Sequence, residues 1–343
     1  MKQLTSFLTF FLLSTLLCMG GIVPEPAGMT AGKGNLKISG AVFKCDPAID
    51  SAAMDAISRF AARLSLVSGK TSSVSAPFGL KAAVDGGAVK GMVFLKDNTL
   101  EGESYHISIG QKAAVVRAGS REGLLNALQT LKQMLPEEIY GEEPAEKQKW
   151  MLPRCEITDS PANGIRGLSI DSCENFWSID QIILCLDEMA KYKFNRLRWN
   201  LAGERGWRME VRKYPLLGQA GGYRMENGVR YGGYYTTEQL TRVVSHAASL
   251  GISVTPVLNI SQSIMTLLKP EDTPARQFIG DIVSETAGVF PDRYETISCS
   301  EEFSVDEILK ACGKEPAPEA EFPEVNPASP DTAQLRMLAE KLW

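Results

Sequence analysis

Short apolar stretches alternate with amphipathic helical patterns along the second half of the chain, from Gly164 onward. The expected strands are 165–171, 196–201, 253–259 and 294–298, and the expected helices are 179–191, 237–250, 273–287 and 304–311. Each expected strand is short, apolar and bounded by polar or turn residues. Strands that alternate with helices form βα units, whose strands pair in parallel. This alternation predicts an α/β fold for residues 151–343.

The first half of the chain shows a different mixture of elements. The expected strands are 41–44, 91–96, 105–110 and 113–118, and the expected helices are 51–66 and 120–135. A Gly- and Pro-containing linker over 22–35 precedes them, and a charged stretch over 136–149 follows. With 343 residues and roughly 150 residues per domain, we expect two domains. The first is a small α+β domain over 22–150, and the second covers 151–343.

A Pro- and Glu-rich insert occupies residues 314–330. This composition is typical of an exposed loop. A terminal helix is expected after it, over 331–343.

The first 21 residues have the order of a secretory signal peptide: Lys2, an apolar run from Leu4 to Leu17, then a pair of glycines. The run is shorter than the roughly 20 residues that span a bilayer, which disfavours a membrane anchor. We expect export to the periplasm, the cell surface or the medium. Lipidation of Cys18 is an alternative, although Leu17 stands where a small residue usually precedes a lipidated cysteine.

Composition excludes several classes of function. With 36 Lys and Arg against 41 Asp and Glu, the chain has no basic excess that would favour nucleic acid. Its two histidines, His106 and His246, lie far apart and near no cluster of zinc-ligand spacing. We therefore expect no metal and no cofactor. The six cysteines after the leader are too sparse for a disulfide scaffold. We expect them to be small buried residues, of which two or four could form one or two disulfide bridges.

Motifs in the second half agree in order and spacing with those of one enzyme family. The matching positions are Arg166, Gly167 and Asp171; Met189, Ala190, Tyr192, Lys193 and Asn195; Trp199, Leu201, Gly206, Trp207, Arg208, Glu210, Lys213, Tyr214 and Pro215; Gly232 to Thr236; Gly251, Ile252, Val254 and Pro256; and Phe290, Pro291, Tyr294, Ile297 and Glu301. On these residues the chain resembles glycoside hydrolase family 20, the β-N-acetylhexosaminidases. The first half resembles the small α+β domain that precedes the barrel in many members, so the resemblance covers roughly residues 40 to 313.

The resemblance implies a (β/α)₈ barrel with its active site at the carboxyl ends of the strands. Only four such strands are expected here, so we predict a partial barrel of about the first four βα units, in a divergent and C-terminally shortened member. Both edges of a half barrel expose unpaired backbone groups. We therefore expect either a homodimer or a partner chain that completes the half barrel.

The family mechanism, as the resemblance implies it, uses the acetamido oxygen of the substrate as nucleophile, with an Asp that stabilises it and a following Glu that protonates the leaving group. This pair aligns with Ser300 and Glu301. Glu301 is the candidate general acid, although a role at a helix N-terminus is an equal alternative. If the lost carboxylate is worth about 3 to 4 kcal/mol, its replacement by Ser300 slows the reaction by roughly two to three powers of ten.

Other polar positions of the family site are altered as well. Glu174, Asn175, Arg198, Asn200 and Gly203 stand where the family has an Arg, three His and an acid. The sequence therefore predicts a secreted β-N-acetylhexosaminidase homologue with impaired catalysis, whose partner is a glycan containing N-acetylhexosamine and not a nucleic acid. The alternatives are a non-catalytic homologue that binds a glycan or a protein, and a fragment without a stable fold.

Two tryptophans are candidates for substrate binding, because aromatic rings commonly stack on sugars. These are Trp199 and Trp177, near the ends of expected strands or in loops, and Tyr223 is a weaker candidate. Ordinary packing is the alternative for all three.

Overall fold

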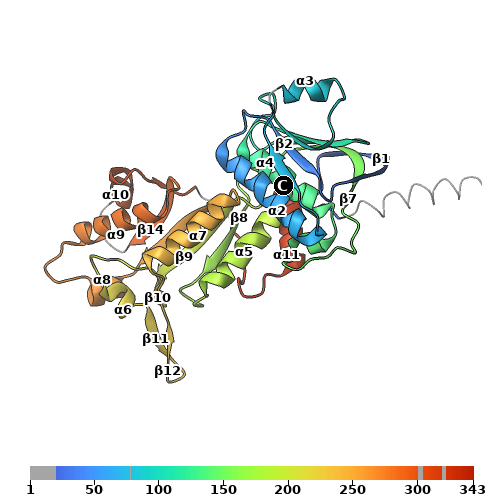
Figure 1. The fold of residues 1–343 in the computed structure, drawn as a ribbon. Helices are drawn as coiled ribbons and strands as arrows, with labels where there is room; N and C mark the ends of the chain where they lie inside the picture. The colour runs from blue at the N-terminus through green and yellow to red at the C-terminus, as the bar shows by residue number, and fades with distance from the viewer. Residues whose placement is uncertain (1–20, 78, 300–303, 319–321) are drawn as a thin grey trace, which may run out of the picture. The chain divides into compact units, whose positions relative to one another are not determined.

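The computed structural model describes residues 21–77, 79–299, 304–318 and 322–343. The chain divides into two compact units (Figure 1). Of the described residues, the first unit holds those up to Gly164 together with Lys191–Lys193 and Arg336–Trp343, and the second holds those within Ile165–Ala190 and Phe194–Leu335.

A seven-stranded mixed sheet forms the centre of the first unit, in the order β1-β7-β5-β6-β4-β2-β3. Its strands are β1 (Gly28–Lys37), β2 (Val42–Cys45), β3 (Ser73–Ser75), β4 (Gly91–Lys96), β5 (Tyr105–Ile109), β6 (Ala113–Ala118) and β7 (Met151–Asp159). Its helices are α2 (Ser51–Ser68), α3 (Leu80–Asp85) and α4 (Arg121–Gln133), with a 3₁₀ turn, η1, at Glu137–Tyr140.

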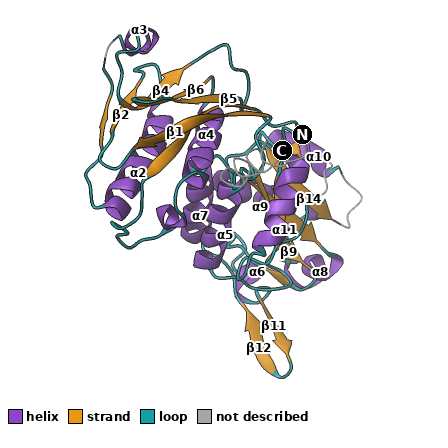
Figure 2. Ribbon diagram, turned by 90° about the vertical axis from the view of Figure 1, so that its right-hand side faces the viewer, coloured by secondary structure: helices purple, strands orange, loops and turns teal. Residues whose placement is uncertain are grey.

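The two faces of this sheet have separate hydrophobic cores, because neighbouring residues of a strand point to opposite faces. Met92 and Phe94 of β4 belong to the larger cluster, which contains the apolar faces of α2 and α4. Val93 and Leu95 belong to a smaller cluster with Leu80 of α3. Figure 2 shows α2 and α4 together beneath the strands and α3 apart from them.

Three strands of the first unit, β1, β3 and β7, are absent from the sequence prediction. The expected linker over 22–35 is wrong from Gly28 onward, because β1 begins there and pairs antiparallel with β7. Nearly every residue of β1 is exposed or partly exposed, so the strand has no apolar alternation that would reveal it. Its regularity comes from the pairing with β7.

The four parallel strands expected in the second unit are confirmed, in the order β8-β9-β13-β14. They are β8 (Gly167–Asp171), β9 (Arg196–Gly203), β13 (Ser253–Ile260) and β14 (Tyr294–Cys299). The helices that follow them are α5 (Ile179–Lys191), α7 (Thr237–Ser249), α9 (Ala275–Val289) and α10 (Val305–Ala311). The unit is thus a mixed α/β structure built from successive βα units.

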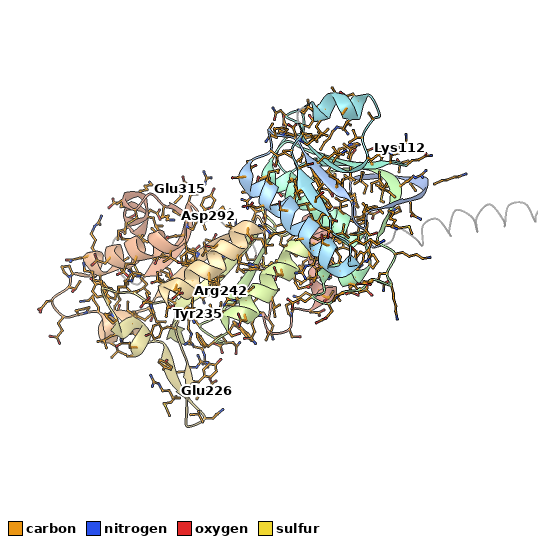
Figure 3. The ribbon with its side chains drawn as sticks, viewed as in Figure 1. Lys112, Glu226, Tyr235, Arg242, Asp292 and Glu315 are labelled. Carbon is orange, nitrogen blue, oxygen red and sulfur yellow. The ribbon has the colours of Figure 1, made fainter. Side chains whose placement is uncertain are left out.

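Smaller elements lie in the connections and near the C-terminus. They are β10 (Gly206–Trp207), α6 (Leu216–Gln219), β11 (Tyr223–Glu226), β12 (Val229–Gly232), α8 (Gln262–Leu268), β15 (Glu315–Pro316) and α11 (Thr332–Leu342). Strands β11 and β12 form a hairpin, on which Figure 3 labels Glu226. Its two-residue turn is Asn227-Gly228, whose φ angles of 49° and 78° are those of a type I′ turn.

The insert over 314–330 is only partly the exposed loop that its composition predicts. Lys314 and Val325 are buried. Residues Glu315–Pro316 pair in parallel with β14, and Glu324 forms a parallel bridge with Ser169 of β8. Backbone pairing, which composition does not encode, orders both ends of this segment.

The six cysteines after residue 21 all lie within the described residues, and all are free thiols. The one or two bridges that the sequence leaves open are therefore not formed among them. Within the described part of the chain, no helix is both long and apolar enough to cross a membrane.

Candidate functional site

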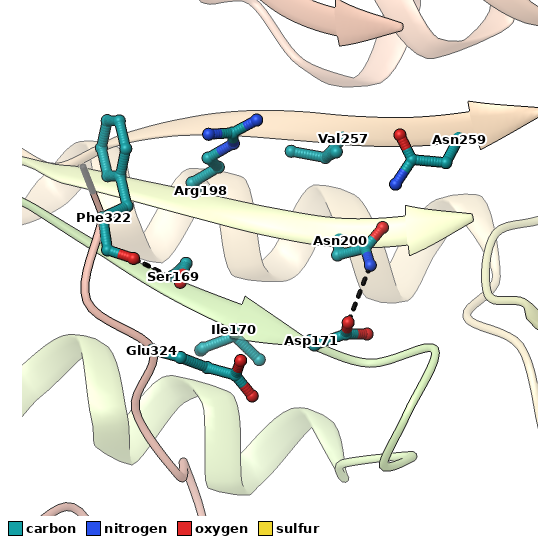
Figure 4. Close-up of a pocket in the computed structure, with 9 residues that line it drawn as sticks. All are labelled: Ser169, Ile170, Asp171, Arg198, Asn200, Val257, Asn259, Phe322 and Glu324. Carbon is teal, nitrogen blue, oxygen red and sulfur yellow. Dashed lines mark hydrogen bonds between the residues drawn. The ribbon is translucent and has the colours of Figure 1, made fainter. Parts of the chain in front are cut away.

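The parallel strands of the second unit separate apolar from polar side chains. In β9, the side chains of Leu197, Trp199 and Leu201 are buried, whereas those of Arg198 and Asn200 are partly exposed on the opposite face. A pocket of about 230 Å³ lies on this polar face. It is lined by Ser169, Ile170, Asp171, Arg198, Asn200, Val257, Asn259, Phe322 and Glu324 (Figure 4).

Asp171 and Asn200 form the polar centre of the pocket. Asp171 is the last residue of β8, and it stands opposite Asn200 of β9 in the parallel register. The Asn200 Nδ2 donates to Asp171 Oδ2 at 2.9 Å (Figure 4). The Asp171 Oδ1 accepts from the backbone N–H groups of Cys173 and Glu174, at 2.7 and 3.0 Å, which forms the turn that ends the strand. The carboxylate is thus fixed by three donors.

The oxygen of the Asn200 amide, unlike its nitrogen, makes no hydrogen bond to the described residues. This atom, Oδ1, is buried. A buried acceptor without a donor costs roughly 1 to 3 kcal/mol. A ligand hydroxyl or amide N–H in the pocket would satisfy this oxygen.

Asn259 supplies a second carboxamide at the end of β13. It is exposed, and its Oδ1 accepts from the hydroxyl of Ser298, its partner in β14, at 2.6 Å. The carboxyl ends of three adjacent strands therefore carry one carboxylate and two carboxamides. Such groups bind sugar hydroxyls and acetamido groups through hydrogen bonds.

Phe322 lines the opposite end of the pocket. The Arg198 guanidinium lies over the Phe322 ring, 5.7 Å from its centroid. Figure 4 shows both side chains at the start of the strands, away from Asp171, Asn200 and Asn259. The pocket consequently holds a carboxylate and carboxamides toward the carboxyl ends of the strands, and an aromatic ring beside a guanidinium at the other end.

A packed layer behind the strands holds the loop that follows β8. The Ser172 hydroxyl accepts from Trp199 Nε1 at 2.8 Å and is hydrogen-bonded to the Tyr235 hydroxyl at 3.1 Å. Tyr235 also stacks on Phe176, with the ring centroids 4.9 Å apart. Burial raises the pKa of Tyr235, so its hydroxyl remains a donor.

Arg208 orders the same loop from within. Its side chain has no exposed surface, and it donates to the backbone carbonyls of Ser172, Gly222, Gly233 and Cys173. Burial lowers the pKa of its guanidinium, although arginine stays charged in proteins. The charge is dispersed over carbonyl dipoles. Motif matching alone does not assign this role to Arg208.

The residues proposed from sequence have different outcomes. Ser300 and Glu301 lie outside the described residues. Trp199 has no exposed surface and packs in the layer just described, so it presents no ring to a sugar. Trp177 is partly buried, and its carbonyl accepts from the Tyr235 hydroxyl at 2.8 Å. Trp177 stays a prediction. Tyr223 lies on β11 beneath the Arg230 guanidinium, 3.7 Å from the ring centroid.

The sequence reasoning missed Asp171, Asn200 and Asn259 as one polar set. Their common signal is a polar residue at the carboxyl end of an apolar strand, which parallel pairing brings to one edge. Among the described residues, no group of three or more His, Cys, Asp or Glu side chains could hold a metal ion.

Comparison with protein families assigns both units. Residues 164–269 match the catalytic domain of glycosyl hydrolase family 20, and residues 20–160 match domain 2 of the same family. The chain belongs to glycosyl hydrolase family 20.

Curated relatives in this family are named as hexosaminidases. A beta-hexosaminidase of Porphyromonas gingivalis is 31% identical over 222 residues, which are 57% of this chain and 28% of the relative. One of Akkermansia muciniphila is 33% identical over 165 residues, which are 47% of this chain and 32% of the relative. The matched segments thus span about a third or less of these two proteins.

Solved structures of the family share the fold. The beta-hexosaminidase of Streptomyces plicatus, in complex with the product GlcNAc, has a TM-score of 0.71 at 23% identity, over 85% of this chain and 64% of that one. The beta-N-acetylhexosaminidase of Bacteroides fragilis has a TM-score of 0.69 at 21% identity, over 94% of this chain and 72% of that one.

Proposed function

We propose that this protein is a β-N-acetylhexosaminidase homologue that binds a terminal N-acetylhexosamine of a glycan in the pocket of the second unit. The observation that carries the proposal is the set Asp171, Asn200 and Asn259 at the carboxyl ends of β8, β9 and β13. In family 20, as in other barrel enzymes, the site lies at this end of the strands. The names of the relatives, all hexosaminidases, support the sugar class.

The size of the pocket supports a single sugar ring as ligand. Its volume of about 230 Å³ lies below the roughly 300 to 1,000 Å³ of pockets that enclose drug-sized ligands. The Asn200 Oδ1, which has no hydrogen-bond partner among the described residues, offers an acceptor for an acetamide N–H or a hydroxyl. We further propose that β8, β9, β13 and β14 correspond to the first four βα units of the family's barrel.

Hydrolysis by this chain is proposed to be slow. The position of the family's stabilising Asp is occupied by Ser300, whose hydroxyl cannot balance the positive charge that develops on the acetamide. Glu301 remains at the position of the general acid. If both roles transfer, the chain keeps proton donation and loses about two to three powers of ten in rate.

Release of the aryl group from an aryl N-acetyl-β-glucosaminide tests this function. We expect slow turnover by the wild type, none by Glu301→Gln, and a kcat about 100-fold or more higher in Ser300→Asp. Circular dichroism of each variant controls for folding. Wild-type turnover equal to that of a folded Glu301→Gln, with no gain in Ser300→Asp, would contradict residual catalysis.

The second candidate is a non-catalytic glycan-binding homologue. The two carboxamides at the strand ends favour it, because neutral amides bind sugars but neither donate nor accept a proton in catalysis. Saturable binding of N-acetylglucosamine without turnover in any variant would support this alternative.

Export is a separate proposal and rests on residues 1–21 alone. Mass spectrometry of the protein recovered from a bacterial host tests it. A mature N-terminus close to Gly21 is expected, and a lipid-modified Cys18 would support the lipoprotein instead.

A further inference from the structure

Strand β8 is an outer strand of the parallel sheet in the second unit, since β9 is its one neighbour among the named strands. An outer strand offers backbone N–H and C=O groups to any chain that can pair with it. In β8 the backbone N–H and C=O groups of Ser169 point to this outer side. What pairs with Ser169 therefore decides whether this edge can bind another molecule.

A short segment of the same chain, Phe322–Val325, occupies this edge. The Ser169 N–H donates to the carbonyl of Pro323 at 2.9 Å, and the Val325 N–H donates to the carbonyl of Ser169 at 2.9 Å. The Ser169 hydroxyl donates to the carbonyl of Phe322 at 2.9 Å. The resulting parallel bridge joins Ser169 to Glu324. This is the hydrogen-bond pattern by which proteins add an extended peptide to a sheet.

A notch in β8, the space left by the absent side chain of Gly167, accommodates an aromatic ring. A Cβ atom at Gly167 would lie 2.0 and 2.3 Å from two ring atoms of Phe322, so the ring occupies the space that a side chain at 167 would fill. The Arg198 guanidinium approaches the same ring. Val325, at the other end of the segment, is buried, with 6% of its surface exposed.

The opposite outer strand is paired as well. The Glu315 N–H donates to the carbonyl of Arg293 at 2.7 Å, and the Ala317 N–H donates to the carbonyl of Glu295 at 3.0 Å. Strand β15 thereby extends the sheet beyond β14. From the sequence, we expect both outer edges of the parallel sheet to be unpaired. Both are paired instead, each with a different stretch of the insert over 314–330.

We propose that Phe322–Val325 is a built-in strand ligand, which occupies in cis a strand-binding groove on β8 and keeps that groove from pairing with a second copy of this chain. The groove consists of Gly167 and Ser169 of β8 with Arg198 of β9. The proposal does not depend on the sugar that the pocket takes. At this edge, β8 pairs with Phe322–Val325 of its own chain instead of with a strand of another chain.

Gly167→Ala tests the proposal, because the three atoms nearest to the added methyl group all belong to the Phe322 ring. Gly164→Ala is the matched control, since a Cβ there meets nothing within 4 Å. Phe322→Ala in the Gly167→Ala background removes the ring and makes room for the methyl group. Hydrogen exchange at Ser169 and Val325 and the mass in solution are measured for each.

In the wild type and in Gly164→Ala, we expect protected amides at Ser169 and Val325 and a monomer. In Gly167→Ala, both amides should exchange at least about tenfold faster, with a dimer that grows with concentration. In the double variant, protection should return. Unchanged protection of α7 shows that the unit remains folded.

Val325→Pro is the second test, should Gly167→Ala fold poorly. It removes the N–H that donates to Ser169 and leaves the notch intact, so exchange at Ser169 should again accelerate. Full exchange of Val325 in the wild type would overturn the proposal. Protection that survives Gly167→Ala would also overturn it, as would a wild-type dimer.

Discussion

Asn200 donates its amide N–H to Asp171 at 2.9 Å, while the oxygen of the same amide is buried and has no partner among the described residues. The Asp171 carboxylate, itself fixed by two backbone donors, thus sets the orientation of the Asn200 amide. A neutral amide and a carboxylate can share this contact at neutral pH. Two carboxylates could not.

Asn200→Asp should therefore make stability depend on pH. Two carboxylates at this distance cannot both be ionised, so the folded variant retains a proton that the unfolded chain releases near pH 4. Folding then takes up a proton, and stability falls as the pH rises above about 4. We expect a loss of about 1 to 3 kcal/mol at pH 7 that largely disappears at pH 4, measured by urea unfolding.

Asn259→Asp is the matched control for this prediction. Its side-chain oxygen accepts from the Ser298 hydroxyl, which can donate equally well to a carboxylate. It should show the pH dependence of the wild type. Equal behaviour of the two variants would refute the role of the Asp171 contact.

A buried ion pair should dominate the stability of the first unit. Lys193 Nζ and Asp159 Oδ2 lie 3.0 Å apart, and neither side chain is exposed. The carboxylate also accepts from Tyr105 and from Trp343 Nε1. Burial acts to raise the pKa of Asp159, but the charge of Lys193 and these hydrogen bonds outweigh it and hold the pKa below its ordinary value. The backbone of Lys193, at φ 61°, is left-handed and strained, so side-chain contacts must hold it there.

Lys193→Met should cost about 3 to 5 kcal/mol, because it leaves the Asp159 charge buried without its cation. Arg242→Met is the control: its ion pair with Asp180 is exposed, so the expected cost is below about 1 kcal/mol. Chemical denaturation, followed by the circular dichroism of the whole chain, measures both. A cost for Lys193→Met no larger than for Arg242→Met would contradict this account.

Glu295 of β14 should make the second unit less stable at alkaline pH. The residue has no exposed surface, and neither carboxylate oxygen has a hydrogen-bond partner among the described residues. Burial raises the pKa of Glu295 to about 7, against the opposing effect of Lys314, whose Nζ is 3.9 Å away. The stability that the neutral form provides is present below about pH 4.5 and is lost as the pH rises through about 7.

Glu295→Gln should remove this dependence, which amounts to about 3 kcal/mol across that interval. Glu307→Gln, at an exposed ion pair with Arg276, should keep the slope of the wild type. Thermal unfolding from pH 4.5 to 8 compares the three proteins. A slope in Glu295→Gln as steep as in the wild type would show that another group titrates.

Periodicity predicted the elements that are apolar on one face. The strand at Gly91–Lys96 and the helix at Ile179–Lys191 are found at the predicted boundaries. Strand β1 and the pairing of Glu324 escaped prediction, because each depends on backbone hydrogen bonds to a distant segment and not on its own side chains. The insert at 314–330 was misjudged for the same reason.

The candidate site was predicted in part. The family resemblance implied a site at the carboxyl ends of the strands, whereas the search for a sugar-stacking ring selected Trp199, which is a core residue. The facing of Asp171 and Asn200 follows from the register between β8 and β9, and a single sequence does not encode register. Phe322 lines the pocket, although its segment was predicted to be an exposed loop from composition.

Titration of N-acetylglucosamine into the purified protein tests the central claim, that the polar pocket is a sugar site. Calorimetry should show saturable binding with a Kd of about 1 mM. The affinity should fall about tenfold in Asn200→Ala, and it should not change in Asn98→Ala, an exposed residue of the first unit. Absence of saturation at tens of millimolar sugar, or equal affinity in Asn200→Ala and the wild type, would contradict the assignment.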